Sequence, residues 1–163
     1  MIHLVTFANE AMTISGQVCE ESGRRQGAQA VWYWRHPGLK QTPFYRENQQ
    51  LLDQPKGCGY FAWKPFVVLD TLLNRCKPGD ILIYSDAGVE FVENVNHVIS
   101  RMDQDIFLFS NKFQHAHWCK TDIIAAINGT TDWSKFDKQV QASVAFFKVT
   151  ERSIQFARDW LHF

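Results

Sequence analysis

One aspartate in the sequence stands where a carboxylate could hold a metal ion. Residues 81–84 form a continuous apolar segment that leads directly into Ser85-Asp86-Ala87-Gly88. Hard cations such as Mg²⁺ and Mn²⁺ prefer oxygen ligands, and they commonly bind one or two carboxylates together with substrate phosphates. Gly88 would let the chain turn tightly and approach a ligand. The residue types fit a metal–diphosphate site at Asp86, and they fit equally a simpler role in which Asp86 caps the following turn.

A segment rich in glycine and aromatic residues, GCGYFAWKPF at residues 57–66, is the second candidate for chemistry. Its rings could stack on a ligand, and the ammonium of Lys64 is a compact charge suited to phosphate. The same segment also fits the start of a helix at Pro65, since proline loses nothing at a first helical position. In that interpretation Lys64 is simply solvated.

Two further segments carry groups that could contact a sugar or a metal. In QHAHWCKTD, residues 114–122, the side chains of His115, His117 and Cys119 alternate and would face one side of an extended strand. That spacing could suit zinc, but a tetrahedral site needs a fourth ligand and no paired motif supplies one. A contact with a sugar or phosphate and a plain polar loop are the alternatives. Gln139 and Gln141 precede an apolar segment and could bind a sugar or satisfy backbone groups.

The composition is that of a globular chain without global charge. Hydrophobic residues make up 45% of the 163 residues, and 17 basic residues balance 17 acidic ones, which removes any general attraction to nucleic acid or membranes. No apolar run approaches the ~20 residues of a membrane helix, and no signal peptide is evident. We therefore expect a cytoplasmic protein whose four cysteines are reduced. The motifs G-x-x-x-x-G-K-[ST], G-x-G-x-x-G and G-x-S-x-G do not occur.

Alternating strands and helices must position these groups. The patterns predict strands at residues 2–7, 30–34, 81–84, 105–110 and 142–147, and helices within 9–27 and at 45–52, 65–74, 93–102, 121–127 and 151–161. Residues 36–43 are expected to be loop and 56–59 a turn. The alternation predicts an α/β fold with a central, mostly parallel sheet flanked by helices. In such sheets ligands bind beyond the carboxyl ends of the strands, where Asp86 stands.

We expect a single domain over residues 1–163. Because the last residues, RDWLHF, lie inside an apparent helix, the chain could also be a fragment of a longer protein.

Five segments taken together resemble a known family. GCGYFAWKP, ILIYSDAGVEF, HWCKTD, QVQAS and RDWL are similar, in this order, to segments of the small GT-A-type glycosyltransferases of bacterial polysaccharide loci and large algal viruses. The resemblance covers about residues 57–163 and the opening HLVTFAN, and only the combination is specific. It implies a GT-A-like fold and transfer of a hexose from a UDP-sugar to a glycan or glycoprotein, with Mn²⁺ or Mg²⁺ as cofactor. For a viral chain the implied location is the host cytoplasm.

The resemblance also implies roles for individual residues. Uracil and ribose would be bound by Thr6, Phe7 and Ala8. The nucleotide and its phosphates would be bound by Lys64, Ser85, Asp86 and Ala87, with Asp86 as metal ligand. The sugar or acceptor would be contacted by His115, His117, Trp118 and Gln141. The family commonly has D-x-D, whose second aspartate is replaced here by Gly88, so another group would have to complete the metal site. Phe61 stands where tryptophan is usual.

The stereochemical course stays open at this point. Glycosyl transfer requires the charge of the leaving diphosphate to be neutralised, which a bound metal ion does as a Lewis acid. A retaining enzyme, which we favour, could place Gln141 under the anomeric carbon, whereas an inverting enzyme would need a general base, with Asp132 or Asp122 as candidates. A nucleotidyltransferase and a non-catalytic carbohydrate-binding module on a degenerate transferase fold are the alternative functions.

Overall fold

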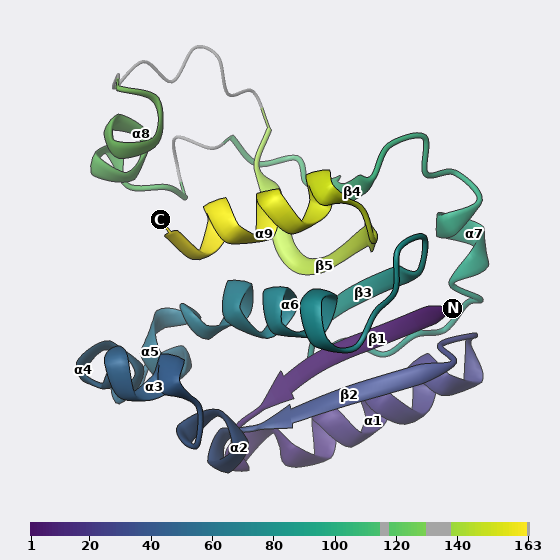
Figure 1. Cartoon of the computed structure of the whole chain (residues 1–163), viewed down its shortest axis with the longest axis horizontal. Coiled ribbons are helices and arrows are strands. Elements are labelled where there is room, and N and C mark those ends of the chain that lie inside the picture. The colour runs from purple at the N-terminus through teal and green to yellow at the C-terminus, as the bar shows by residue number, and fades with distance from the viewer. Residues whose placement is uncertain (115–117, 130–137, 163) are drawn as a thin grey trace.

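A single five-stranded sheet forms the centre of the protein (Figure 1). The structure is a computed structural model, and it describes residues 1–114, 118–129 and 138–162. The strands are β1 (Ile2–Ala8), β2 (Ala30–Arg35), β3 (Ile81–Asp86), β4 (Ile106–Ser110) and β5 (Val140–Lys148), and their order is β2-β1-β3-β5-β4. β1 is parallel to β2 and β3, whereas β5 is antiparallel to both β3 and β4. Within the described sheet only β5 is reversed, so the expected α/β fold with a mostly parallel sheet is confirmed.

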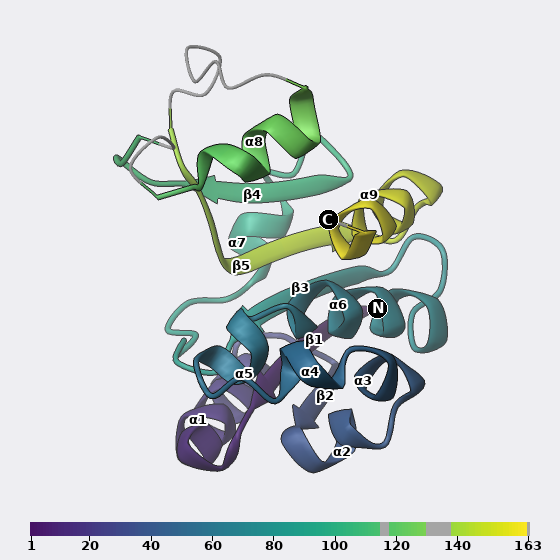
Figure 2. The same cartoon turned by 90° about the vertical axis from the view of Figure 1, so that its left-hand side faces the viewer.

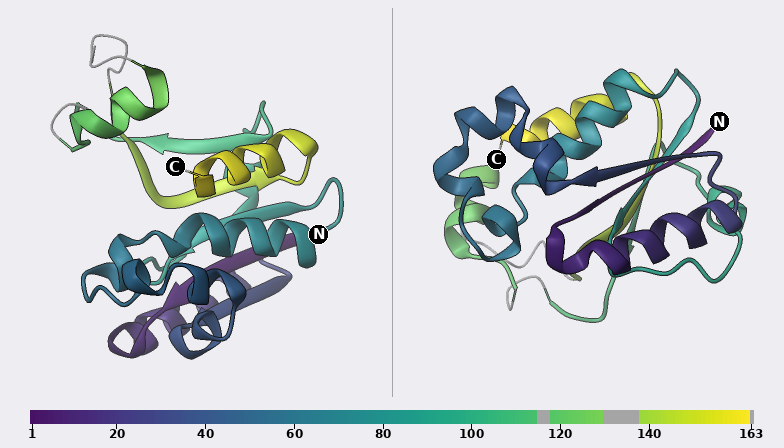
Figure 3. Two further views of the ribbon diagram at one scale, coloured as in Figure 1. Left: turned by 60° about the vertical axis from the view of Figure 1, so that its left-hand side comes forward. Right: turned by 90° about the horizontal axis from the view of Figure 1, so that it is seen from below.

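Helices cover both faces of the sheet, as Figure 3 shows. α6 (Trp63–Asn74) and α9 (Glu151–His162) lie on one face, and α1 (Thr13–Arg25) lies on the other. Adjacent residues of one strand point to opposite faces. Val5 and Leu82 accordingly belong to the apolar cluster under α6 and α9, whereas Leu4 and Ile83 belong to the second cluster. This two-sided burial explains why β1 and β3 are mostly apolar along their length, with His3 and Thr6 as buried polar residues of β1.

Four short helices follow β2 and lie near the carboxyl end of the parallel strands (Figure 2). They are α2 (His36–Lys40), α3 (Pro43–Glu47), α4 (Gln49–Leu52) and α5 (Gly57–Tyr60). The prediction of a loop at 36–43 is therefore wrong for α2, because a proline is tolerated in the first turn of a helix. The predicted helix at 45–52 is two helices that meet at Asn48, whose φ of −117° and ψ of 22° interrupt them.

Two other helices differ in extent from the sequence predictions. α6 begins at Trp63, two residues before the predicted start, and its buried face includes Val67, Val68 and Leu72, while Leu73 is 47% exposed. The predicted helix at 93–102 is reduced to α7 (Asn96–Ile99), and the Asn94 side chain accepts from Asn96 N at 2.9 Å just before it. α8 (Thr121–Asn128) matches its prediction closely.

No helix in the described part of the chain is both long and apolar enough to cross a membrane.

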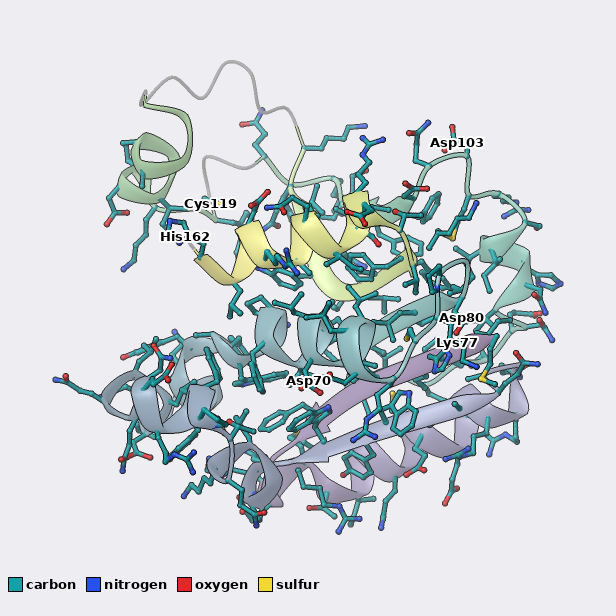
Figure 4. All side chains as sticks on the ribbon, in the orientation of Figure 1. Asp70, Lys77, Asp80, Asp103, Cys119 and His162 are labelled. Carbon is teal, nitrogen blue, oxygen red and sulfur yellow. The ribbon has the colours of Figure 1, made fainter. Side chains whose placement is uncertain are left out.

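A polar network ties the amino ends of β1, β2 and β3 together. Asp80 accepts hydrogen bonds from the Met1 ammonium at 2.6 Å, from Lys77 N at 2.8 Å and from His3 Nε2 at 3.1 Å. Trp32 Nε1 donates to His3 Nδ1 at 3.1 Å, which places the ring proton of His3 on Nε2. Asp80 and Lys77 lie at the opposite end of the sheet from α2–α5 (Figure 4). The Met1 ammonium, together with Lys77 N and His3, lowers the pKa of Asp80 to about 2.

This network predicts a loss of stability in acid. The folded pKa of Asp80 lies below its ordinary value of 3.8, so its contribution to stability is present above about pH 4 and is lost as the pH falls towards 2. We expect Asp80→Asn to lower the urea midpoint at pH 7 and to match the wild type near pH 2. The exposed Asp103→Asn variant serves as control. A difference between wild type and Asp80→Asn that persists unchanged to pH 2 would contradict this role.

Candidate functional site

A cavity of about 320 Å³ opens where the parallel strands β1 and β3 end. Its walls come from three places in the sequence: the end of β1 and the following 3-10 helix η1 (Glu10–Met12), the segment from α5 to α6, and the end of β3. The lining residues are Phe7, Ala8, Asn9, Met12, Gly57, Cys58, Phe61, Trp63, Asp86, Ala87 and Gly88. Phe7 and Asp86 are register partners in the sheet, so sheet pairing itself brings the two strand ends together. This is the position at which open α/β sheets bind ligands.

Asp86 is held by two side chains inside this site. Lys64 Nζ lies 2.8 Å from Asp86 Oδ1 and 3.1 Å from Asp86 Oδ2, and the Tyr84 hydroxyl donates to Oδ1. Burial and the negative charge of Asp86 raise the pKa of Tyr84 well above its ordinary value, so this hydroxyl stays protonated. The carboxylate therefore points towards Lys64 and Tyr84. The turn after β3 is closed by Val89 N, which donates to the backbone carbonyl of Asp86 at 3.1 Å, and not by a cap from the Asp86 side chain.

Lys64 is buried rather than solvated. The residue is 8% exposed, and its ammonium also donates to the Ala142 carbonyl of β5 at 3.2 Å. The ring centroids of Phe61 and Tyr84 lie 5.1 Å and 5.6 Å from Nζ, within the range of a cation–π contact. The interpretation of Lys64 as a solvent-facing residue at a helix start is wrong, because α6 packs this side of its first turn against β3 and β5.

Aromatic rings form one wall of the cavity. Phe7 and Trp63 pack at a centroid distance of 4.0 Å, and both are buried. Trp63 Nε1 donates to the Gly57 carbonyl at 2.9 Å, which fixes the indole under the preceding turn. Phe61 is 49% exposed. Of these three rings, Phe61 is the most exposed and so the most accessible to a bound ligand.

The wall that carries Phe61 is a left-handed turn. All five residues from 57 to 61 have positive φ: 60° at Gly57, 51° at Cys58, 87° at Gly59, 53° at Tyr60 and 66° at Phe61. Tyr60 N donates to the Lys56 carbonyl at 2.7 Å, and Asn9 Nδ2 donates to Cys58 Sγ at 3.4 Å. Left-handed backbone costs about 1–2 kcal/mol for each non-glycine residue. Strain of this kind is concentrated at functional sites, where the surrounding structure holds it in place.

A second cavity, of about 340 Å³, lies beside the first. It opens between β4, β5 and α9 and is lined by Leu108, Val140, Gln141, Ala142, Ala145, Phe147, Phe156, Asp159 and Trp160. Its polar side chains are Gln141 and Asp159, and the rest of its lining is apolar. Ala142 lines the second cavity, and its carbonyl accepts from Lys64, which is paired with Asp86 in the lining of the first.

The structure places the residues expected to take part in binding or catalysis differently. Phe7, Ala8, Asp86 and Ala87 line the first cavity, with Lys64 directly behind Asp86. Gln141 lines the second cavity. Thr6 and Ser85 are fully buried below the cavity floor, while Trp118 is 61% exposed and packs against Phe113, outside both linings. Asp122 is exposed in the first turn of α8. His115, His117 and Asp132 lie outside the described residues.

Several lining residues were not found from the sequence. Asn9 and Met12 follow the end of β1, so extending the strand-end argument used for Asp86 would have found them. Trp63 lies in a segment already singled out, but no sequence signal separates it from its aromatic neighbours. Asp159 and Trp160 face the second cavity only because α9 packs beside β5, and that packing has no local sequence signal.

The site offers one carboxylate to a metal ion. Within residues 1–114, 118–129 and 138–162 no group of three or more His, Cys, Asp or Glu side chains is arranged to hold a metal. Asp86 is 36% exposed at its side chain and borders the cavity, so its chemistry fits a hard cation that brings phosphate ligands with it. The same carboxylate is already paired with Lys64. A metal ion at Asp86 therefore competes with an ammonium.

Comparisons with known proteins find likeness only at the level of structure. No protein-family model matches the chain, and no curated protein matches it. The apo form of the glycosyltransferase GlyE from Streptococcus pneumoniae TIGR4 has a TM-score of 0.49 and 8% identity, covering 96% of this chain and 36% of that chain. The apo form of mouse xyloside xylosyltransferase 1 has a TM-score of 0.49 and 13% identity, covering 100% of this chain and 77% of that chain. This chain thus spans little more than a third of GlyE, and we transfer no residue role from either protein.

The left-handed turn predicts a sharp penalty for a methyl group at Gly59. A Cβ there would lie 2.6 Å from Leu52 Cα and 2.9 Å from the Leu51 carbonyl oxygen, on a φ of +87°. We expect Gly59→Ala to lower the free energy of unfolding by at least about 2 kcal/mol in urea denaturation. Gly38→Ala is the matched control, because nothing lies within 4 Å of its Cβ and its φ is not positive. Equal stability of the two variants would show that the turn adopts another conformation.

Proposed function

We propose that this chain is a glycosyltransferase that takes a sugar from a nucleotide donor, with a UDP-hexose as the donor class. One observation carries the proposal: the carboxylate of Asp86 and the ammonium of Lys64 meet at the edge of a cavity formed by the ends of β1 and β3. A carboxylate can hold the metal ion of a metal–diphosphate complex, and an ammonium can bind its phosphate oxygens. The motifs that resemble GT-A-type glycosyltransferases include both residues.

The first cavity accommodates the nucleotide in this proposal. Phe7, Ala8 and Asn9 supply the wall at the end of β1, and the exposed face of Phe61 can stack on a uracil ring. The diphosphate lies against the Asp86 end of the cavity. Mn²⁺ or Mg²⁺, held by Asp86, would neutralise the charge that develops on the diphosphate as the glycosidic bond breaks.

The second cavity accommodates the acceptor. Its apolar wall includes Trp160, a ring that can pack on the C–H face of a sugar, while Gln141 and Asp159 provide hydrogen-bonding groups. Ala142 lines this cavity and its carbonyl accepts from Lys64, so an acceptor hydroxyl would approach the donor from the Lys64–Asp86 side. Holding the two substrates in this orientation supplies much of the rate enhancement. A retaining course, with Gln141 beside the anomeric carbon, remains our proposal, and the inverting alternative uses Asp132.

A non-catalytic carbohydrate-binding module is the second candidate function. It is favoured by one observation, namely that the Asp86 carboxylate is already neutralised by Lys64 and the rest of the first cavity's lining is uncharged. A neutral glycan would bind there without a metal ion. Such a protein would bind oligosaccharide equally in EDTA and in Mn²⁺ and would consume no nucleotide sugar.

Calorimetry separates these functions. We expect UDP to bind the full chain in the presence of Mn²⁺ more tightly than GDP or CMP, and a UDP-hexose to release UDP when acceptor is present. Release of pyrophosphate from a nucleoside triphosphate would instead identify a nucleotidyltransferase. If no nucleotide binds with or without Mn²⁺, the transferase proposal is wrong.

Asp86→Asn tests the carboxylate within this proposal. Because a neutral amide is a poor ligand for a hard cation, we expect the Mn²⁺-dependent affinity for UDP to fall at least about tenfold. Asp103→Asn is the matched control, since Asp103 is exposed and distant from α5 in Figure 4. Circular dichroism checks that both variants keep the fold. Unchanged UDP affinity in a folded Asp86→Asn variant would remove Asp86 from the site.

A further inference from the structure

The two groups that the proposed function needs, the Lys64 ammonium and the Asp86 carboxylate, are paired with each other. We propose that Lys64 is an exchangeable counter-ion: it excludes a divalent cation from Asp86 until a nucleotide diphosphate arrives to take over the ammonium. This inference rests on the proposed function and goes further, because it states that metal and nucleotide enter as a pair and names the residue that enforces it.

The geometry pairs the two charged groups with each other. Both carboxylate oxygens of Asp86 lie within 3.1 Å of Lys64 Nζ, and Oδ1 also accepts from the Tyr84 hydroxyl. The ammonium has three donors, and its acceptors are the two Asp86 oxygens and the Ala142 carbonyl at 3.2 Å. A cation at Asp86 must therefore either displace Lys64 from the carboxylate or bind beside the ammonium and be repelled by it.

A metal ion by itself meets an unfavourable site. Binding at Asp86 would separate the buried ammonium from its carboxylate and place a second positive charge beside it. A buried charge that loses its partner is strongly destabilising. A diphosphate by itself is also disfavoured, because it would approach Lys64 while Asp86 remains negative.

Metal and diphosphate together remove both penalties. Asp86 would then have the metal ion as partner and Lys64 a phosphate oxygen, so neither the buried ammonium nor the partly exposed carboxylate would be left unpaired. The Ala142 carbonyl and the rings of Phe61 and Tyr84 contact the ammonium independently of the Asp86 carboxylate, so Lys64 keeps contacts while it changes partner. By linkage, metal and nucleotide must raise each other's affinity by the same factor.

The alternative is a fixed structural ion pair that joins α6, β3 and β5. Both cases allow a gain in Mn²⁺ affinity when Lys64 is removed, because either removal frees the carboxylate, so the absence of a gain excludes the counter-ion role. The two cases differ in what the wild-type ammonium does: a fixed pair stays intact when UDP and a divalent cation bind, whereas an exchangeable counter-ion moves from Asp86 to a phosphate oxygen.

The test is a titration of Mn²⁺ into nucleotide-free protein, followed by the electron paramagnetic resonance signal of free Mn²⁺. We expect Lys64→Met to bind Mn²⁺ at least about tenfold more tightly than the wild type, within the usual range of coupling between sites. The double variant Lys64→Met/Asp86→Asn should lose the gain, and Lys77→Met, at an exposed lysine distant from the cavity, should match the wild type. Lys64→Gln repeats the test with a polar side chain.

Equal Mn²⁺ affinity in folded Lys64→Met and wild type would overturn the proposal, and so would a gain that survives in the double variant. Nitrogen-15 NMR of the Lys64 ammonium provides a test on the wild type that does not depend on any variant's folding. The signal should stay unchanged with Mg²⁺ and shift when UDP and Mg²⁺ are both added. A shift with Mg²⁺ and no nucleotide, or no shift when UDP–Mg²⁺ binds, would overturn it.

Failure of this inference differs from failure of the proposed function. If UDP binds with Mn²⁺ but Lys64→Met gains no metal affinity, the transferase proposal stands and the counter-ion role is wrong. If no nucleotide binds under any condition while Lys64→Met gains Mn²⁺ at Asp86, Lys64 does compete for the carboxylate and the transferase proposal is wrong.

Discussion

A buried ammonium must have acceptors, and the architecture around the site meets this requirement for Lys64. Its partners come from two neighbouring strands, Asp86 at the end of β3 and the Ala142 carbonyl of β5. They lie within reach of one amine only because β3 and β5 are adjacent and pair with Ser85 opposite Val144. The position of α6 across these strands is equally constrained, since Lys64 stands in its first turn. The placement of a single charge thus depends on the strand order.

The cavity beside this ion pair is built from strained and tightly packed segments. The left-handed turn at residues 57–61 brings Phe61 next to the Lys64 ammonium, and the Trp63 indole anchors the turn by donating to Gly57. Tight packing of Leu51 and Leu52 behind Gly59 leaves no room for a side chain there. Such a wall holds its shape before a ligand arrives, which reduces the ordering cost of binding. The strain and the ion pair are therefore two parts of one preorganised site.

The sequence predicts the framework of the fold better than it predicts the site. β1, β3 and α9 were found because burial on both faces produces apolar runs and burial on one face produces helical periodicity. Asp86 was found because it directly follows such a run. The antiparallel direction of β5 was not predicted, since strand direction depends on long-range pairing and leaves no local pattern.

Other features of the site depend on tertiary contacts that are separated in sequence. Lys64 looked like a solvated residue at a helix start, and its burial becomes evident only when Asp86 and Ala142, 22 and 78 residues away, are brought next to it. The left-handed backbone at Cys58, Tyr60 and Phe61 was equally hidden, because non-glycine residues rarely adopt it. The second cavity forms where α9 packs beside β5, so neither segment indicates it separately.

The most direct test of this account is a crystal structure of the full chain with UDP and Mn²⁺. We predict uridine against Phe7, Ala8 and Phe61, the metal ion on Asp86, and the Lys64 ammonium moved from the carboxylate to a phosphate oxygen. A nucleotide bound elsewhere, or one bound in the cavity with the Lys64–Asp86 pair intact and no metal on Asp86, would contradict it.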